Sequence, residues 1–241
     1  MLSIAILAGG LARRLHPLTK TIPKALVDVS GKPFIFHQLT YLKNQGLTDV
    51  VLCVGYLGNM IEDIVGDGSQ FGLSVTYSTD GDVLLGTGGA LKKALPYLGK
   101  SFFVMYGDSF LPINFQVVQN VFLAGDRKAL MTILRNDNRW DKSNVSFVEG
   151  NLIEYNKSEP NQTMSYIDYG LGIISSEVFL RYSEGISFDL ADVYRDLSHH
   201  GELKGLEVFE RFYEIGSHQG LIETNAYFSL RRTNDVYRTA S

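Results

Sequence analysis

The chain has 241 residues, of which 45% are hydrophobic and 20% charged, with 24 glycines, 6 prolines and a single cysteine. This length and composition predict one globular domain large enough to bury a deep site, and a single cysteine excludes an internal disulfide bond. The formal net charge of −4 lacks the basic excess with which proteins bind nucleic acid or anionic membranes, so we expect neither partner.

The first elements of the chain alternate between strand and helix. The run LSIAILAGGLA has no basic region before it and is too short to span a membrane, so it predicts a first core strand in a cytoplasmic protein. Continuous apolar runs predict strands buried on both faces at residues 4–8, 50–54 and 102–106. Helical spacing predicts helices over residues 33–46, 59–65 and 88–98. This alternation is typical of a mostly parallel sheet between layers of helices.

From about Asp108 onward the pattern is less regular. Strands are predicted at residues 130–134, 145–148, 152–155 and 167–174, and helices at residues 189–199 and 217–230. We interpret these elements as an extension of the same sheet, within a single domain spanning residues 1–241. The lone Cys53, inside the run VVLCVGY, is predicted to be a small buried side chain and not a catalytic thiol.

The loop after the first strand gathers positive charge. The stretch LAGGLARRLHPLTKTIPKAL, residues 7–26, holds Arg13, Arg14, Lys20 and Lys24 and no acidic residue. Ligands of open parallel sheets bind at the carboxyl ends of the strands, and two adjacent glycines there can adopt positive φ and approach a ligand closely. The stretch predicts a polyphosphate site, with a solvated basic loop as the alternative. It has neither the spacing of a dinucleotide fingerprint nor that of a P-loop.

The same stretch resembles the opening signature of the sugar-1-phosphate nucleotidyltransferase family, LAGGxGxRLxPLTxxxPKxL. The resemblance implies a three-layer Rossmann-like α/β fold with a mostly parallel central sheet, a nucleotide-binding half over residues 1–110 and a sugar-phosphate-binding half over residues 111–241. One departure is Ala12, where the family has glycine. Alanine is tolerable there only if its φ is negative.

The resemblance assigns nucleotide-binding and catalytic residues. Arg14 would steady the β,γ-phosphates, and Lys24 would lie near the α-phosphate and the incoming sugar phosphate. A second matching segment, GDVLLGTGGALKKAL, would contribute a helix N-terminus and small residues to base and ribose. The nucleotide-binding residues implied by both segments are Leu7, Ala8, Gly9, Gly10, Gly86, Thr87 and Gly88.

Two carboxylates are implied as ligands of one Mg²⁺ ion. The segment FFVMYGDS ends in Asp108, where the family has a metal-binding aspartate, and Mg²⁺ commonly takes one or two carboxylates together with substrate phosphates. In RFYEIGSHQGLIETN, Glu214 stands where the family has its second aspartate. Glutamate keeps the charge and adds one methylene group.

The segment LIEYNKSEPNQTMSYIDYGLGII resembles the sugar-binding part of the family. Glu154 or Lys157 would contact a sugar hydroxyl or the sugar phosphate. Gly170, preceded by Tyr169, stands where the sugar-binding asparagine is usual. Sugar recognition in this chain is therefore expected to differ from the family pattern.

The implied reaction is NTP plus sugar 1-phosphate giving NDP-sugar and pyrophosphate, with Mg²⁺, for surface polysaccharide precursors. The segments look most like the manno-heptose-1-phosphate guanylyltransferase group, followed by muramate-1-phosphate uridylyltransferases, and favour GTP with a manno-heptose 1-phosphate. UTP- or CTP-dependent transfer to another sugar phosphate or a nonsugar phosphate stays open, as does an inactive nucleotide-binding regulatory subunit. Aromatic residues near the C-terminus also indicate self-association, although most are expected in the core: Phe209, Phe212, Tyr213, Tyr227 and Phe228.

Overall fold

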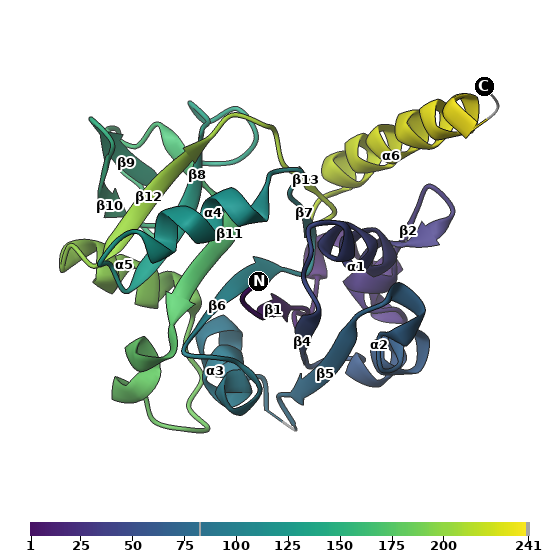
Figure 1. Ribbon diagram of the computed structural model, residues 1–241, viewed down its shortest axis with the longest axis horizontal. Helices are drawn as coiled ribbons and strands as arrows, with labels where there is room; N and C mark the ends of the chain where they lie inside the picture. Colours follow the sequence, from purple (N-terminus) through teal and green to yellow (C-terminus); the bar gives the residue numbers. More distant parts are fainter. Residues whose placement is uncertain (82, 240–241) are drawn as a thin grey trace.

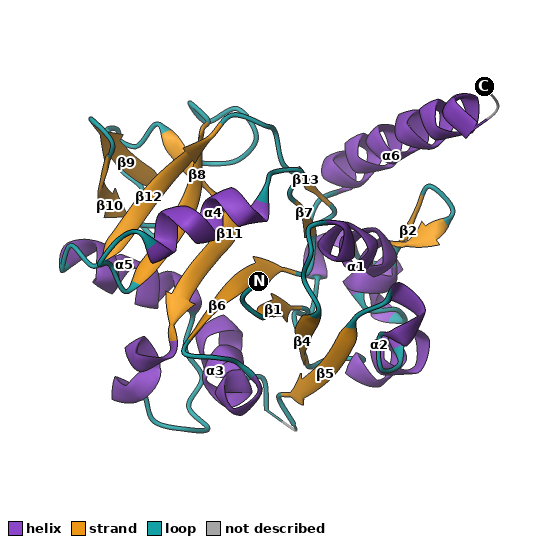
Figure 2. Ribbon diagram, in the orientation of Figure 1, coloured by secondary structure: helices purple, strands orange, loops and turns teal. Residues whose placement is uncertain are grey.

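One mixed sheet of nine strands runs through the part of the chain that the structure describes (Figures 1 and 2). The computed structural model describes residues 1–81 and 83–239, without the side chains of Arg13 and of residues 232–239. Asp82 of the GDVLLGTGG segment and the side chain of Arg13 therefore lie outside the described residues.

The first half of the chain builds the parallel part of the sheet from β1 (Ile4–Leu7), β4 (Asp49–Val54), β5 (Ser74–Thr79) and β6 (Ser101–Tyr106). The order is β6-β1-β4-β5, and each neighbouring pair is parallel. On β1, Ile4 and Ile6 pack into the core on one face of the sheet and Ala5 into the core on the other. Because both faces are covered, β1, β4 and β6 are almost continuously apolar, whereas β5 at the sheet edge mixes polar and apolar residues. The three strands predicted in this half are confirmed; β5 was not predicted.

Helices cover both faces of the sheet. The helices that pack into the core on one face are α1 (Phe34–Asn44), α2 (Gly58–Val65) and α4 (Phe115–Leu123). Those that pack into the core on the opposite face are α3 (Gly86–Ala94) and α5 (Leu190–His199). On α1 the predicted apolar stripe of Ile35, Leu39 and Leu42 is buried, and Gly46 follows the helix with a φ of 87°. The predicted three-layer α/β architecture is confirmed.

The second half extends the sheet through β8 (Ala129–Arg135), β9 (Val145–Val148), β10 (Asn151–Tyr155), β11 (Tyr166–Ser175) and β12 (Leu203–Val208). β11 joins the two halves because it pairs antiparallel with β6 on one side and with β8 on the other. The predicted extension of a single sheet is thus confirmed. The sheet is mixed here, since β9 and β10 form an antiparallel pair and β12 runs parallel to β8.

Short elements complete the fold. A small antiparallel pair, β7 (Ser109–Phe110) and β13 (Tyr213–Glu214), continues the chain beyond β6 and brings the C-terminal segment beside Asp108. A second small pair consists of β2 (Asp28–Val29) and β3 (Lys32–Pro33). The 3-10 helices lie at Arg13–Leu15, Leu18–Lys20, Lys24–Leu26, Ser69–Phe71, Leu95–Tyr97 and Ser176–Arg181.

The last helix, α6 (His218–Thr239), projects from the body of the molecule (Figure 1). Its Tyr227 and Phe228 pack near Phe110 of β7. Of the five aromatic residues named near the C-terminus, three precede α6, and Phe209 among these is 81% exposed. Among the described helices, none combines the length and apolar character needed to span a membrane.

Candidate functional site

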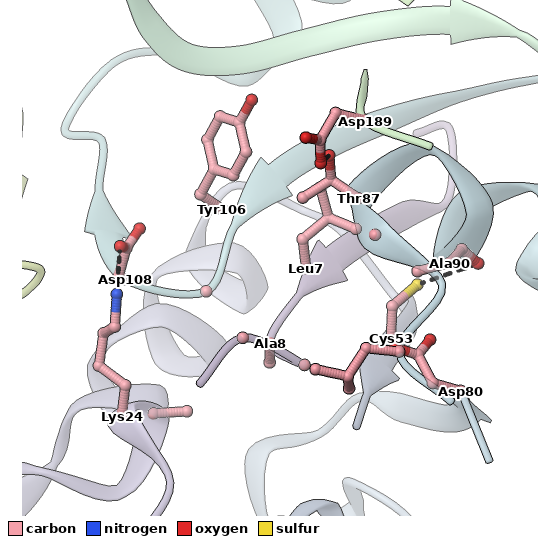
Figure 3. A pocket seen from close by; sticks show the side chains of 16 residues that line it. Leu7, Ala8, Lys24, Cys53, Asp80, Thr87, Ala90, Tyr106, Asp108 and Asp189 are labelled. Carbon is pink, nitrogen blue, oxygen red and sulfur yellow. Dashed lines mark hydrogen bonds and ion pairs between the residues drawn. The ribbon is translucent and has the colours of Figure 1, made fainter. Parts of the chain in front are cut away.

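A cavity of about 330 Å³, here called the first cavity, opens at the carboxyl ends of the parallel strands. Residues from Leu7 to Gly10 line it from the loop after β1, and residues from Tyr106 to Asp108 line it from the end of β6. Figure 3 shows Leu7 and Ala8 in the middle, with Lys24 and Asp108 toward one end and Asp80 toward the other. The cavity occupies the edge at which open parallel sheets bind ligands.

Lys24 and Asp108 form an ion pair at one end of the first cavity (Figure 3). Nζ of Lys24 donates to Oδ2 of Asp108 at 2.7 Å, and Oγ of Ser109 donates to Oδ1 at 3.2 Å. Burial would raise the pKa of Asp108, but the ammonium of Lys24 and both hydrogen bonds hold that pKa below its usual value. The carboxylate is therefore ionised and next to a cation, which suits a site for an anion and a metal ion.

Asp80 lies toward the opposite end of the first cavity, next to Cys53 (Figure 3). The backbone N–H of Leu85 donates to Oδ2 of Asp80 at 3.3 Å, and burial raises the pKa of this carboxyl. Cys53 is 1% exposed, and burial raises the pKa of its thiol to about 12. The prediction that Cys53 is buried is confirmed, and a protonated thiol is a poor nucleophile.

The GTGG segment forms the start of α3 and a wall of the first cavity. Gly86 and Thr87 line the cavity, whereas Gly88 is not among its lining residues. Oγ1 of Thr87 donates to Oδ1 of Asp189 at 3.2 Å (Figure 3). A Cβ on Gly86 would lie 2.6 Å from the carbonyl oxygen of Phe188, and one on Gly88 would overlap the ring of Phe188. These glycines therefore allow α3 to pack against the segment that leads into α5.

The backbone of the glycine loop differs from expectation. Neither Gly9 nor Gly10 has a positive φ; Gly9 instead needs its lack of a side chain, because a Cβ there would lie 3.1 Å from the backbone N of Gly55. Ala12 has a φ of 48°, so the negative φ under which alanine would be tolerated at this position without strain is not adopted. Oγ1 of Thr19 donates to the carbonyl oxygen of Ala12 at 2.8 Å. This bond helps to offset the left-handed conformation, which costs a residue with a Cβ about 1–2 kcal/mol.

A second cavity of about 470 Å³ adjoins the first, because Tyr106 and Asp108 line both. Its other walls come from β11, the loop after β8, β13 and the start of α6. Burial raises the pKa of Tyr106 well above its usual value, so its phenol stays protonated. Because Asp108 lines both cavities, a ligand in the first cavity and a ligand in the second can each contact it.

Glu214 and Arg14 meet Asp108 at this junction. Oε2 of Glu214, Nη2 of Arg14 and Oδ2 of Asp108 all lie within 3.2 Å of the position that a Cβ on Gly216 would take. The Glu214 carboxylate also accepts hydrogen bonds from Gly216 N, from Ser217 N at 3.1 Å and from Ser217 Oγ at 2.5 Å. Glu214 therefore anchors the segment that leads into α6, near a helix N-terminus where a negative charge is favourable, and the helix cap itself is Ser217, whose Oγ accepts from Gly220 N at 2.9 Å.

Comparisons with known proteins identify the family to which this chain belongs. A family model for nucleotidyl transferases matches residues 4–228. This chain belongs to that family. The nucleotidyl transferase is 32% identical over 224 residues to an N-acetylmuramate alpha-1-phosphate uridylyltransferase of Neisseria meningitidis, covering 92% of this chain and 96% of that relative. It is 28% identical over 197 residues to a D-glycero-alpha-D-manno-heptose 1-phosphate guanylyltransferase of Campylobacter jejuni, covering 80% and 86%.

A solved structure shares the fold. HddC from Yersinia pseudotuberculosis, complexed with GMP-PN, superposes on the nucleotidyl transferase with a TM-score of 0.78 at 25% identity, covering 95% of this chain and 100% of that chain. The comparisons together show a sugar-phosphate nucleotidyltransferase, as the motifs predict.

Of the residues expected to bind the sugar, some line the second cavity and one does not. Lys157 lines the second cavity, with Nζ 5.7 Å from the ring centroid of Tyr106. Tyr169 also lines it, but its side chain is 2% exposed and belongs to the core. Gly170 has a φ of 101°, a conformation that glycine alone adopts readily. Glu154 lines neither cavity and accepts a hydrogen bond from Asn161 at 3.1 Å.

Arg14 lines the second cavity and is not among the lining residues of the first. The structure thus brings Arg14 together with Asp108 and Glu214, while Lys24 reaches Asp108 from the side of the first cavity. The described residues contain no cluster of three or more metal-binding side chains, so a metal ion at this junction would need substrate phosphates as ligands besides these two carboxylates.

Sequence reasoning missed several residues that line the cavities. Asp80 follows an edge strand and Asp189 precedes α5, so each occupies a loop end with no motif of its own. Asp168 lies in the segment compared with the family, two residues before Gly170, whose N–H donates to Oδ1 of Asp168 at 2.9 Å. Burial raises the pKa of Asp168. Trp140, the single tryptophan of the chain, stands in the charged segment RNDNRWDKS, and this isolated aromatic was an available signal.

Proposed function

We propose that this nucleotidyltransferase binds a nucleoside triphosphate in the first cavity and a sugar 1-phosphate in the second, and joins them beside Asp108. The observation that carries the proposal is that Tyr106 and Asp108 line both cavities. An oxygen of the sugar phosphate attacks the α-phosphorus, the bond to the β-phosphate breaks, and pyrophosphate leaves. Both reactants are anions, so positioning and charge neutralisation supply most of the catalysis.

The cations divide this task. Lys24, at the junction end of the first cavity, neutralises the α-phosphate and the incoming sugar phosphate. Arg14 meets Asp108 from the side of the second cavity, so its planar fork holds phosphate oxygens at the junction of the two substrates. No activated nucleophile is required, because a phosphate oxygen is already nucleophilic.

The carboxylates of Asp108 and Glu214 fit a Mg²⁺ ion. Both offer oxygen ligands at the junction, and both are partly engaged, Asp108 by Lys24 and Glu214 by the start of α6. When bound, Mg²⁺ would neutralise phosphate charge and orient the two substrates. Lys24 and Arg14, on either side of Asp108, would also neutralise phosphate charge, from positions that the fold fixes.

For the substrates, we propose two candidate pairs in the cytoplasm: GTP with a manno-heptose 1-phosphate, and UTP with a muramate 1-phosphate. The first pair is supported by the acceptor oxygens of Asp80 at the far end of the first cavity, which guanine can meet with two N–H donors and uracil with one. The second pair is supported by the greater share of chain and identity matched in the muramate-specific relative. Lys157 and Asp168 would contact the sugar.

The test is pyrophosphate release by the purified chain with Mg²⁺, each of the four NTPs, and a panel of hexose, heptose and N-acetylhexosamine 1-phosphates plus nonsugar phosphates. We expect one NTP and one acceptor class to support turnover, and Asp108→Asn to remove it. A folded protein that releases no pyrophosphate with any pair would refute the proposal and favour a regulatory, nucleotide-binding role.

A further inference from the structure

One wall of the second cavity is both cationic and aromatic. Arg139, Trp140, Arg211 and Phe212 line it, beside Asp141 and Glu223. The guanidinium carbon of Arg139 lies 5.0 Å from the ring centroid of Trp140, and that of Arg211 lies 5.6 Å from it. Phe212 meets Trp140 edge to face, with the ring centroids 5.9 Å apart. Neither Arg14, Lys24 nor the carboxylates at the junction belong to this wall, so the proposed reaction does not account for it.

The two arginines of this wall differ in their partners. Arg211 forms an ion pair with Glu223, and its buried Nε has no hydrogen-bond partner among the described residues. Arg139 is exposed, and no carboxylate of the described residues pairs with its guanidinium. It is therefore available to a ligand in the cavity.

The backbone of Arg139 is held in place by a structured loop. Asn136, which is 2% exposed, donates from Nδ2 to the carbonyl oxygen of Asp141 at 2.7 Å and to Oγ of Ser143 at 3.0 Å, and accepts from Trp140 N at 3.2 Å. Because a buried amide satisfies the backbone of the loop, the position of the Arg139 backbone is fixed before a ligand arrives. Preorganisation of this kind lowers the entropic cost of binding.

The size of the cavity points in the same direction. The second cavity has a volume of about 470 Å³. Phosphate groups at the junction use part of this space. The remainder accommodates a substituent on the sugar that extends toward Trp140.

We infer that the acceptor carries a second anionic group besides its 1-phosphate, and that Arg139 binds it beside Trp140 and Arg211. A guanidinium stacked on an aromatic face presents its planar fork to a carboxylate or phosphate. This inference rests on the proposed function and separates its two substrate pairs, because a muramate 1-phosphate has a carboxylate on its lactyl substituent and a manno-heptose 1-phosphate does not. It makes Arg139 a specificity-determining residue.

The experiment compares pairs of acceptors of which one member carries a second anionic group and the other does not. The pairs are N-acetylmuramate 1-phosphate against N-acetylglucosamine 1-phosphate, glucuronate 1-phosphate against glucose 1-phosphate, and glucose 1,6-bisphosphate against glucose 1-phosphate. They distinguish a carboxylate on a substituent, a carboxylate on the ring and a second phosphate. With the productive NTP and Mg²⁺, we expect the acidic member of at least one pair to have a kcat/KM about 10- to 100-fold higher, the range of a charge-assisted hydrogen bond.

Variants connect this preference to Arg139. Arg139→Ala is expected to lower kcat/KM for the preferred acidic acceptor about 10- to 100-fold more than for its neutral partner, mainly through KM, and Arg139→Lys to fall between. Arg135→Ala is the matched control, because Arg135 is exposed, pairs with Asp137 and lines neither cavity. Equal use of both members of every pair, or an equal loss for both members in Arg139→Ala, would overturn the inference.

A different result marks failure of the proposed function. If no pair of substrates releases pyrophosphate, that function is refuted, and calorimetric binding of the same acceptors decides the inference. A preference for an acidic member that Arg139→Ala removes would support it. Equal or absent binding would overturn it.

Discussion

The side chain of Glu214 packs against Gly220 in the first turn of α6. We predict that any residue larger than glycine at position 220 lowers the free energy of unfolding. A Cβ on Gly220 would overlap Oε1 and Cδ of Glu214 and would lie 2.7 Å from the Glu214 carbonyl oxygen. Gly220→Ala therefore forces the carboxylate off its hydrogen bonds to Gly216 and Ser217, a loss of bonds to a charged group that costs about 1–2 kcal/mol, and shifts the backbone as well. The higher helix propensity of alanine opposes this by at most about 1 kcal/mol.

The expected balance is a decrease of about 1–3 kcal/mol in the free energy of unfolding, including about 1–2 kcal/mol for the steric shift. Urea denaturation measures it, with Gly99→Ala as the control, because a Cβ there has only an ordinary contact at 3.6 Å. In a Glu214→Ala background the cost of Gly220→Ala should fall by about 1 kcal/mol, since two residues in contact are coupled. A stabilised Gly220→Ala protein, or the same cost in both backgrounds, would refute the placement of Glu214 against α6.

Two further predictions concern charge. Lys24→Ala should lower kcat by about 10²- to 10³-fold, the usual effect of removing a preorganised charge-stabilising group, with an unchanged circular dichroism spectrum; near wild-type turnover would exclude Lys24 from the chemistry. His37 stacks on Phe228 at 4.0 Å, its Nε2 lies 2.8 Å from the carbonyl oxygen of Val29, and burial lowers its pKa below 6.5. The unfolded chain therefore binds the proton more readily, and stability falls as the pH drops below about 6.5, by at most about 1.4 kcal/mol per unit for one proton. His37→Gln should flatten this dependence in urea denaturation at pH 7.5 and 5.5, and an unchanged slope would contradict it.

Much of the fold follows from local sequence. β1, β4 and β6 are buried on both faces and read as continuous apolar runs. β5 escaped prediction because it lies at the sheet edge and its sequence, SVTYST, mixes polar and apolar residues. α4 carried a usable signal: Phe115, Val118 and Phe122 have helical spacing and are buried, and Asn114 caps the helix by accepting from Val117 N.

The candidate site was predictable where a motif spans it and not where it depends on tertiary contacts. Lys24 and Asp108 belong to recognisable motifs and meet across 84 positions. Gly88, assigned to the nucleotide, meets the ring of Phe188, which no local pattern reveals. Trp140 and Arg211 come from separate segments that only the folded sheet brings to one wall.

The contact between Thr87 and Asp189 has a consequence for protein engineering. The first cavity takes Asp189 from the second half of the chain, and Thr87 holds it there by a hydrogen bond. A fragment ending at residue 110 would therefore lack part of the first cavity, where we propose that the nucleotide binds. A chimera that exchanges the second half with a relative, in order to change the sugar, would also exchange a wall of the cavity proposed for the nucleotide, so the two specificities would be inherited together.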